Sequence, residues 1–590
     1  MWVPVATFLP VAVTGLKLRL CVTLALVVPG IWTVGAALAS RRISNRALAF
    51  CVGIAGTLGA AFSILFVGWI AGVGIKATLG VSSAVAIVLV AIRWRSVRET
   101  MTEPVVRDLG VSWLIFLGWC LGLLALVRTY SGGGWAADWV EHWQRAIFFR
   151  ERQPLTTLFA AVYPLTARPP LANVLTAAWL ELTGAHFAAY QVFLTLFGSL
   201  VSLPVCVLAR MWSKSPNASR WAVFVLMLSP LVAQNVTFAW TKLPTAFFVL
   251  TAIAALVHAA RERSAVTLPV TAWCLGLGLL THYSAAAWLL ALGLAAAWAA
   301  RRVLLRRDVQ RQLVVGAVSF FLVTAPWFAW AAWQFGLHGT AAANSTAAAW
   351  AGETPVERVW VALANLFDTI VPFPLRSDVS LDLIRQTSAL GRLRDVAFSL
   401  YQLNLLFACG IAGTLILLWR AGCRRLRAPA SAPAALLMVA IPLAIAIGVW
   451  VHTPRDTWGL VHICLQPLVL LGLASVASTL ADQAAFRSLW ALVATVDFVL
   501  GIALHFALES WPVPAGHSPA AVLANETLNH TAAMNACDKL AFGFSFFSDI
   551  LALPTFALWG WLAGLLALAL CRLMPAGAVG ARFPVSLPRP

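Results

Sequence analysis

Four side chains that can pair charges or move protons follow one another at helical spacing between residues 131 and 154. They are Asp138, Glu141, His142 and Arg145, at positions i, i+3, i+4 and i+7, so a helix would place them on one face. A carboxylate on such a face can accept the proton of an attacking hydroxyl group. A solvated helix whose charges pair three and four residues apart has the same spacing. The pattern is therefore compatible with a catalytic or a structural role.

Helix signals frame this segment. Glycines precede it, Pro154 follows it, and Trp139, Trp143 and Ile147 lie four residues apart on a neighbouring face. A helix with one aromatic side and one titratable side is typical of a membrane interface. We therefore expect its rings at the level of the lipid headgroups and its polar face toward a cavity.

The composition indicates the environment of this helix. The chain has 590 residues, of which 61% are hydrophobic and 11% charged, whereas a soluble protein carries about 25% charged residues. So little charge cannot cover a water-exposed surface. The composition excludes a disordered chain, a coiled coil, a collagen-like fibre and almost any soluble enzyme, and it predicts an all-α polytopic membrane protein.

The net charge of +19 fits the same interpretation. Apolar stretches near the roughly 20 residues that span a bilayer alternate with short basic clusters. If every cluster lies on the cytoplasmic side, each pair of spans between two clusters crosses the membrane outward and back, as the positive-inside rule requires. The charge is thus a topology signal, and nucleic acid is not expected as a partner. Examples of the clusters are Arg41–Arg42–Arg46, Arg93–Arg95–Arg98 and Arg420–Arg424–Arg425.

Roughly 13–16 transmembrane helices are expected, among them spans near 221–238 and 432–451, and three long connections lie on the outer side. Because the chain spends its extramembrane residues on that side, its activity is expected there. The expected order is transmembrane helices in 1–128, an outer loop with amphipathic helices and the active site in 129–186, transmembrane hairpins in 187–335, an outer loop in 336–400, transmembrane helices in 401–506, an outer loop in 507–550, and a last helix with a cytoplasmic tail in 551–590.

The segments after Pro154 carry a family resemblance. Tyr163-Pro is followed by Arg168-Pro-Pro-Leu, and an amphipathic helix is expected from the proline pair to Gly184. This order resembles the GT-C superfamily of membrane glycosyltransferases, which includes protein mannosyltransferases and lipid A aminoarabinose transferases. The resemblance covers roughly residues 112–480 as an order of segments and is sharp around 135–184. Lys242 at the start of a span and the outer His-Tyr-Ser at 282–284 also match.

The resemblance implies roles for individual residues. Asp138 matches the family's catalytic base, and Glu141 is the second candidate. Where many members have Asp-Glu, this chain has Asp-Trp. Fixed cations should stabilise the departing phosphate; the candidates on the outer side are Arg168, Lys242 and Arg455. Expected cavity-lining residues are His142, Arg145, Tyr163, His282 and Tyr283.

The implied reaction transfers a sugar from a polyprenyl-phosphate donor to a hydroxyl of a glycan, lipid or protein acceptor, with inversion. The expected location is the bacterial inner membrane, with the active site facing the periplasm. The sequence requires no cofactor. The family's second acidic residue is replaced by the neighbourhood of Lys242, so metal dependence stays open.

Two other functions stay open. A transporter or flippase for a lipid-linked saccharide could use Asp497, which lies inside an apolar stretch, as a proton relay; an interhelical hydrogen bond is the alternative and favoured role. An envelope oligosaccharide ligase or polymerase would keep its basic and His residues in a late outer loop. Here the loop 507–550 holds His517, His530 and Lys539.

Overall fold

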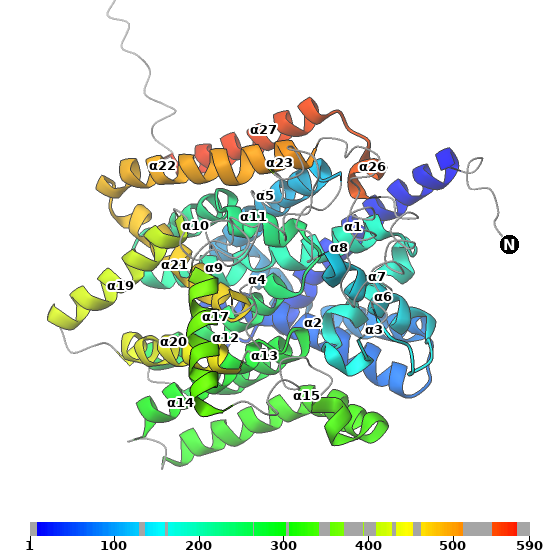
Figure 1. The fold of residues 1–590 in the computed structure, drawn as a ribbon, viewed down its shortest axis with the longest axis horizontal. Coiled ribbons are helices and arrows are strands. Elements are labelled where there is room, and N and C mark those ends of the chain that lie inside the picture. Colours follow the sequence, from blue (N-terminus) through cyan, green and yellow to red (C-terminus); the bar gives the residue numbers. More distant parts are fainter. Residues whose placement is uncertain are drawn as a thin grey trace, which may run out of the picture.

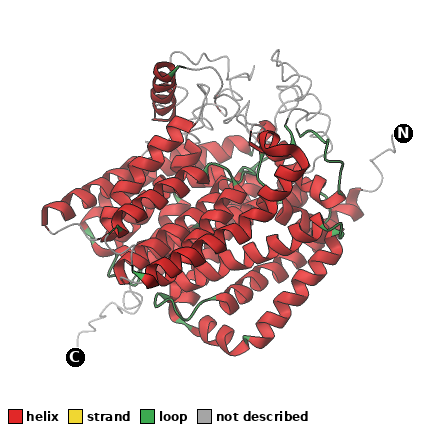
Figure 2. Ribbon diagram, turned by 90° about the horizontal axis from the view of Figure 1, so that it is seen from below, coloured by secondary structure: helices red, strands yellow, loops and turns green. Residues whose placement is uncertain are grey.

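The computed structural model describes residues 9–128, 136–159, 163–262, 265–301, 306–341, 354–370, 393, 409–427, 432–451, 462–510 and 546–574. Within them the regular elements are helices, apart from one isolated antiparallel bridge between Phe159 and Tyr163. Figure 2 shows the long helices running roughly parallel or antiparallel to one another. The expected all-helical fold is therefore confirmed.

The helices follow the hydropathy of the sequence. The first half contains α1 (Leu9–Leu38), α2 (Arg46–Ile70), α3 (Ile75–Ile92), α4 (Trp94–Thr102), α5 (Pro104–Leu126), α6 (Ala136–Glu151), η3 (Leu165–Ala167), α7 (Leu171–Thr183), α8 (Phe187–Ser199), α9 (Ser202–Trp212), α10 (Ala218–Met227), α11 (Pro230–Thr237), α12 (Lys242–Glu262), η4 (Ala265–Thr267), α13 (Leu268–Thr281) and α14 (Ala285–Ala300). The second half contains α15 (Arg307–Ala341), α17 (Pro355–Ile370), α19 (Cys409–Arg427), α20 (Ala432–Val451), α21 (His462–Asp482), α22 (Ala485–Asp497), η7 (Phe498–Leu504), α23 (His505–Glu509), α26 (Phe547–Leu551) and α27 (Thr555–Leu573).

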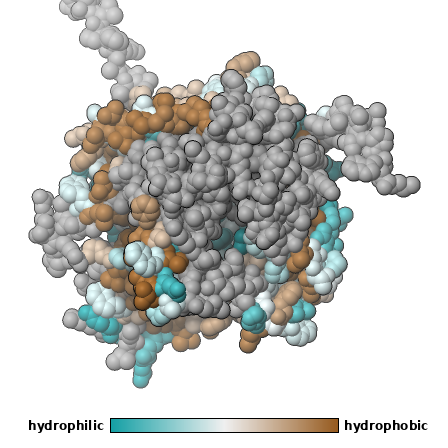
Figure 3. Space-filling view, viewed as in Figure 1, coloured by the Kyte–Doolittle hydropathy of each residue, from teal (hydrophilic) through white to brown (hydrophobic). Residues whose placement is uncertain are grey.

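Burial separates the central helices from the peripheral ones. Among the described residues, nine helices are long and apolar enough to span a bilayer, and five shorter helices are also apolar. The run of α8 and α9 is buried throughout and α12 nearly so, whereas α22 and α27 expose large apolar side chains such as Leu492 and Phe556. Figure 3 shows this apolar surface as a brown band over α22 and α27. Such a surface is stable against lipid, so the chain is a multi-pass membrane protein.

Contacts between helix termini define two ends of the bundle. At one end, which we call the basic end, Arg41 pairs with Glu99, and the Ser213 hydroxyl donates to Asp482 at 2.6 Å. At the other, which we call the loop end, Arg128 lies 3.7 Å from Asp549. α6 and α7 lie at the loop end. The same alternation of ends was expected from the basic clusters.

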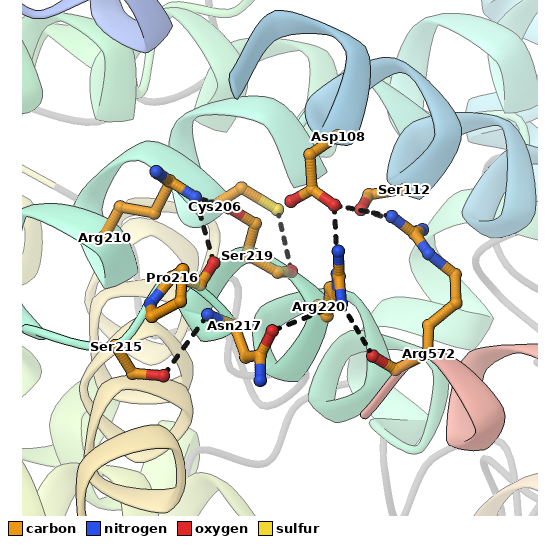
Figure 4. Close-up of polar contacts among 10 residues, drawn as sticks. All are labelled: Asp108, Ser112, Cys206, Arg210, Ser215, Pro216, Asn217, Ser219, Arg220 and Arg572. Atoms are coloured by element: carbon orange, nitrogen blue, oxygen red, sulfur yellow. Dashed lines mark hydrogen bonds and ion pairs between the residues drawn. The ribbon is translucent and has the colours of Figure 1, made fainter. Parts of the chain in front are cut away.

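A polar cluster at the basic end ties three helices together (Figure 4). The Oδ1 atom of Asp108 on α5 accepts hydrogen bonds from Arg220 Nε of α10 at 3.0 Å and from Arg572 Nη2 of α27 at 2.7 Å. Arg572 also donates to the hydroxyl of Ser112. One largely buried carboxylate thus attaches the C-terminal span to the rest of the bundle.

Asp497 also joins two helices. Its Oδ2 atom accepts the backbone N–H of Cys409, at the start of α19, at 2.7 Å. The side chain is buried, and the π-helix η7 follows directly. This contact agrees with the interhelical hydrogen bond that the sequence favoured for Asp497.

Candidate functional site

The outer loop between α5 and α8 contains the two helices that its sequence predicted. α6 ends at Glu151, where Arg152 has a positive φ of 55° and Pro154 prevents continuation of the helix. α7 begins after the proline pair and ends at Gly184, whose φ of 98° favours glycine. The Arg152 guanidinium donates to the carbonyls of Trp69 and Val73. The C-terminus of α6 is thereby fixed to the loop end of α2.

A buried ion pair forms the centre of the site. Arg145 donates to Oε1 of Glu141 from Nε at 3.1 Å and from Nη2 at 2.6 Å, and both side chains are 1% exposed. Arg145 also donates to the carbonyl of Leu165 at 2.6 Å and to that of Pro164 at 2.9 Å. Its guanidinium carbon lies 4.2 Å from the ring centroid of Phe159. Arg145 therefore joins α6 to the backbone of η3.

Arg168 is the outer member of the cluster. Its Nη2 atom lies 3.3 Å from Oε2 of Glu141, and its guanidinium lies 5.5 Å from the ring of Tyr163. The Arg168 side chain is 19% exposed. One carboxylate thus pairs with two guanidinium groups, and that of Arg168 is the one nearer to solvent. A partly exposed cation held in this way suits an anionic ligand.

The pKa values follow from burial and neighbouring charges. Burial raises the pKa of Glu141, but Arg168 and Arg145 outweigh it, so that pKa lies below its ordinary value. Burial lowers the pKa of His142 to about 4, and its Nδ1 donates to Oδ1 of Asn173 at 3.0 Å. At neutral pH Glu141 is therefore ionised and His142 uncharged. A low pKa and two cationic partners favour a positioning role for Glu141 over that of a base.

Two further elements hold η3 in place. The Tyr283 hydroxyl, in the turn between α13 and α14, donates to the carbonyl of Thr166 at 3.1 Å. Trp327 of α15 donates to that hydroxyl at 3.3 Å. The Thr166 hydroxyl donates to the carbonyl of Gly339, near the end of α15, at 2.9 Å. The backbone that receives Arg145 is thus fixed from both sides.

The structure brings together six of the residues that the sequence singled out. They are Glu141, His142, Arg145, Tyr163, Arg168 and Tyr283. Asp138 belongs to α6, on the same helical face as Glu141 and His142; its side chain lies outside the described part. Arg455 also lies outside the described residues.

The other two predicted residues lie at helix ends. Lys242 begins α12 and is buried, with Nζ 3.4 Å from the ring centroid of Trp240. His282 follows α13, and its Nδ1 lies 2.9 Å from Oγ of Ser284. Lys242 therefore has the cation–π environment of a desolvated cation.

One expectation for α6 is wrong. Trp143 was expected at the headgroup level, but it is buried and lies edge-on to Phe187 and Tyr190, with ring centroids 5.8 and 5.7 Å away. The polar side chains 141, 142 and 145 are buried as well, because α7 and η3 cover that face. Around residues 141–145, α6 therefore lies inside the protein and is covered on both faces.

Sequence reasoning also missed two partners. The carbonyl and hydroxyl of Thr166 connect η3 to its neighbours, and Oδ1 of Asn173 accepts a hydrogen bond from the His142 ring. Asn173 is a polar residue within the largely apolar α7, which is the signal that could have identified it. Among the described residues, no group of three or more His, Cys, Asp and Glu side chains could hold a metal ion.

Comparison with solved structures finds similar chains. The chain is similar to ArnT from Cupriavidus metallidurans bound to undecaprenyl phosphate, with 13% sequence identity, 78% of this chain and 77% of that chain covered, and a TM-score of 0.45. It is also similar to the archaeal oligosaccharyltransferase AglB from Archaeoglobus fulgidus in complex with an inhibitory peptide and a dolichol-phosphate, with 16% identity, 71% and 58% covered, and a TM-score of 0.38. Both are polytopic glycosyltransferases of the GT-C fold. No family model and no curated protein matches the sequence.

Proposed function

We propose that this chain is a membrane glycosyltransferase that moves a sugar from a polyprenyl-phosphate carrier to an acceptor hydroxyl at the loop end. The observation that carries the proposal is Arg168, a partly exposed cation whose position is set by the buried Glu141–Arg145 pair. The sequence resemblance around residues 135–184 supports the same chemistry. An apolar carrier tail can dissolve in the bilayer while the sugar and phosphate lie at its surface.

Asp138 is the proposed base. It takes the proton of the acceptor hydroxyl while the hydroxyl oxygen forms a bond to the anomeric carbon. The bond between that carbon and the phosphate oxygen breaks, and its electron pair leaves with the phosphate. Attack from the face opposite the phosphate inverts the configuration.

Arg168 is proposed to stabilise the charge that develops on the departing phosphate, with Lys242 and Arg455 as further cations. A cation is most effective when it needs no rearrangement during the reaction. Arg145 is fixed by carbonyls of η3, Glu141 is fixed by Arg145, and Arg168 pairs with Glu141. This chain of contacts supports a preorganised anion site.

The proposed orientation places the loop end on the outer side of a bacterial inner membrane. The basic end carries the Arg clusters that the positive-inside rule assigns to the cytoplasm. The acceptor hydroxyl belongs to a glycan, lipid or protein that reaches the outer surface.

The test is sugar transfer by the purified protein in lipid vesicles, with undecaprenyl phosphate carrying different labelled sugars as donors. Arg168→Gln removes a charged hydrogen bond worth about 1.5–3 kcal/mol, so kcat/KM should fall about 10- to 100-fold. Arg150→Gln is the matched control, because Arg150 also lies in this loop and pairs with Glu181 at 3.1 Å. Equal activity of both variants, or no transfer from any donor, would overturn the proposal.

A further inference from the structure

α17, in the second outer loop, has an apolar face that the rest of the described chain does not cover. Five large apolar side chains recur at intervals of three and four residues and are between 47% and 70% exposed. This spacing places them in one stripe along the helix. We call them the α17 stripe: Val356, Val359, Trp360, Leu363 and Phe367.

The opposite face of α17 is packed against α20. Ala362 and Leu366 pack with apolar side chains of α20, and Asn365 is buried. Arg358 is also buried, with its guanidinium carbon 6.0 Å from the ring centroid of Trp450. The Arg358 guanidinium group therefore faces protein, while the apolar stripe faces outward.

The N-terminus of α17 is held independently of the stripe. A carboxylate oxygen of Glu357 accepts hydrogen bonds from the backbone N–H of Thr354 at 2.7 Å and from its hydroxyl at 2.8 Å. The Thr354 hydroxyl is in turn 3.3 Å from the N–H of Glu357, as in a capping box. The helix is thus stabilised by its cap and by α20.

The direction of α17 differs from that of the spans. In Figure 1 it runs across α20 and reaches α14. It packs at the end of α20 that carries Trp450 and Val451, both of which are exposed. The α17 stripe therefore lies beside the apolar, tryptophan-bearing surface that α20 exposes at the loop end.

We infer that α17 is an in-plane membrane helix whose stripe binds the acyl chains of the lipid leaflet at the loop end. Its occupant is lipid because the stripe adjoins the exposed apolar end of the α20 span, at Trp450 and Val451. The sole exposed charged side chain described on α17, Glu357, lies in the first turn. Trp360 then lies at the depth where tryptophan is enriched in membrane proteins. This inference does not depend on the proposed transferase chemistry.

Site-specific photocrosslinking of the full chain in vesicles of phosphatidylethanolamine and phosphatidylglycerol tests the inference. The photoreactive residue p-benzoylphenylalanine replaces Trp360 or Leu363 in the stripe, and in a control variant it replaces Glu357 beside the stripe. Position 492, on the exposed face of α22, is the positive control. We expect phospholipid adducts at 360 and 363 with a yield near that at 492, and at least fivefold less at 357.

Adducts from 360 and 363 to a second copy of the chain would show a dimer interface and overturn the inference. An absence of lipid adducts at both positions, with a normal yield at 492, would overturn it as well. Because two stripe positions are tested, misfolding of one variant leaves the other to decide. The readout needs no enzymatic activity, so its failure is distinguishable from failure of the proposed function.

Discussion

Replacing Glu141 by Gln should destabilise the protein strongly, because the buried Glu141 carboxylate pairs with both Arg145 and Arg168. Removing one partner of a buried ion pair costs about 3–5 kcal/mol. Gln keeps an oxygen that Arg145 can donate to, and Arg145 also keeps the carbonyls of Pro164 and Leu165. We therefore expect the free energy of unfolding to fall by about 3 kcal/mol, the lower end of this range.

The matched control is Glu99→Gln. Glu99 pairs with Arg41 and, at 3.1 Å, with Arg95, and all three side chains are at least 49% exposed, so water screens these pairs. Its loss should cost about 0–1 kcal/mol. Thermal unfolding of the purified protein in detergent, followed by tryptophan fluorescence, compares both variants with the wild type. Equal stability of Glu141→Gln and wild type at pH 7 would refute the buried ion pair.

The same comparison has a pH dependence of known sign. The folded-state pKa of Glu141 lies below the ordinary value of 4.5, so its contribution is present above pH 4.5 and is lost as the pH falls through the folded-state pKa. The gap between wild type and Glu141→Gln should therefore close at low pH. A gap that stays constant or widens on acidification would contradict this explanation.

Two further predictions concern other buried groups. Folding lowers the pKa of His142 from 6.5 to about 4, so between these pH values the unfolded chain binds a proton that the folded chain does not, and stability is lost as the pH falls through this window. Unfolding measured at stepped pH should show a loss of about 3 kcal/mol in wild type. The loss should be smaller in His142→Gln, whose side chain can still donate to Asn173. Arg572→Leu should lower the free energy of unfolding by about 3 kcal/mol, because it breaks the pair with the largely buried Asp108. The control Arg41→Leu, at a 59% exposed position, should lower it by only about 0–1 kcal/mol. Equal losses of both variants in thermal unfolding would contradict the role of the Asp108 cluster.

The sequence predicted the helices well because a bilayer imposes length and hydropathy on each span. The stretch expected at 432–451 coincides with α20, and most others agree within a few residues. The exceptions have local causes. The span expected at 221–238 is divided between α10 and α11 at Pro230, which lacks the N–H that a continuous helix requires.

The candidate site could be predicted only in part. Residue spacing predicted the shared face of α6, since helical periodicity is local. The partners of Arg145 are backbone carbonyls about twenty positions away, and carbonyls carry no side-chain signal. The burial of this face of α6 could not be predicted either, because it depends on how α7 and η3 pack against it. The α17 stripe lies within the loop 336–400, which the positive-inside rule placed on the outer side.

The central claim is that a base on α6 activates the acceptor hydroxyl, and Asp138→Asn tests it most directly. Sugar transfer from labelled undecaprenyl-phosphate donors is measured in vesicles for wild type, Asp138→Asn and the control Glu151→Gln, which also neutralises an acidic residue of α6. Loss of a general base should lower kcat by about 10²- to 10⁴-fold, while Glu151→Gln should stay within about twofold, since its side chain is half exposed. Unchanged transfer in Asp138→Asn would contradict the account. So would a wild-type protein that transfers no sugar but moves lipid-linked sugar across the bilayer.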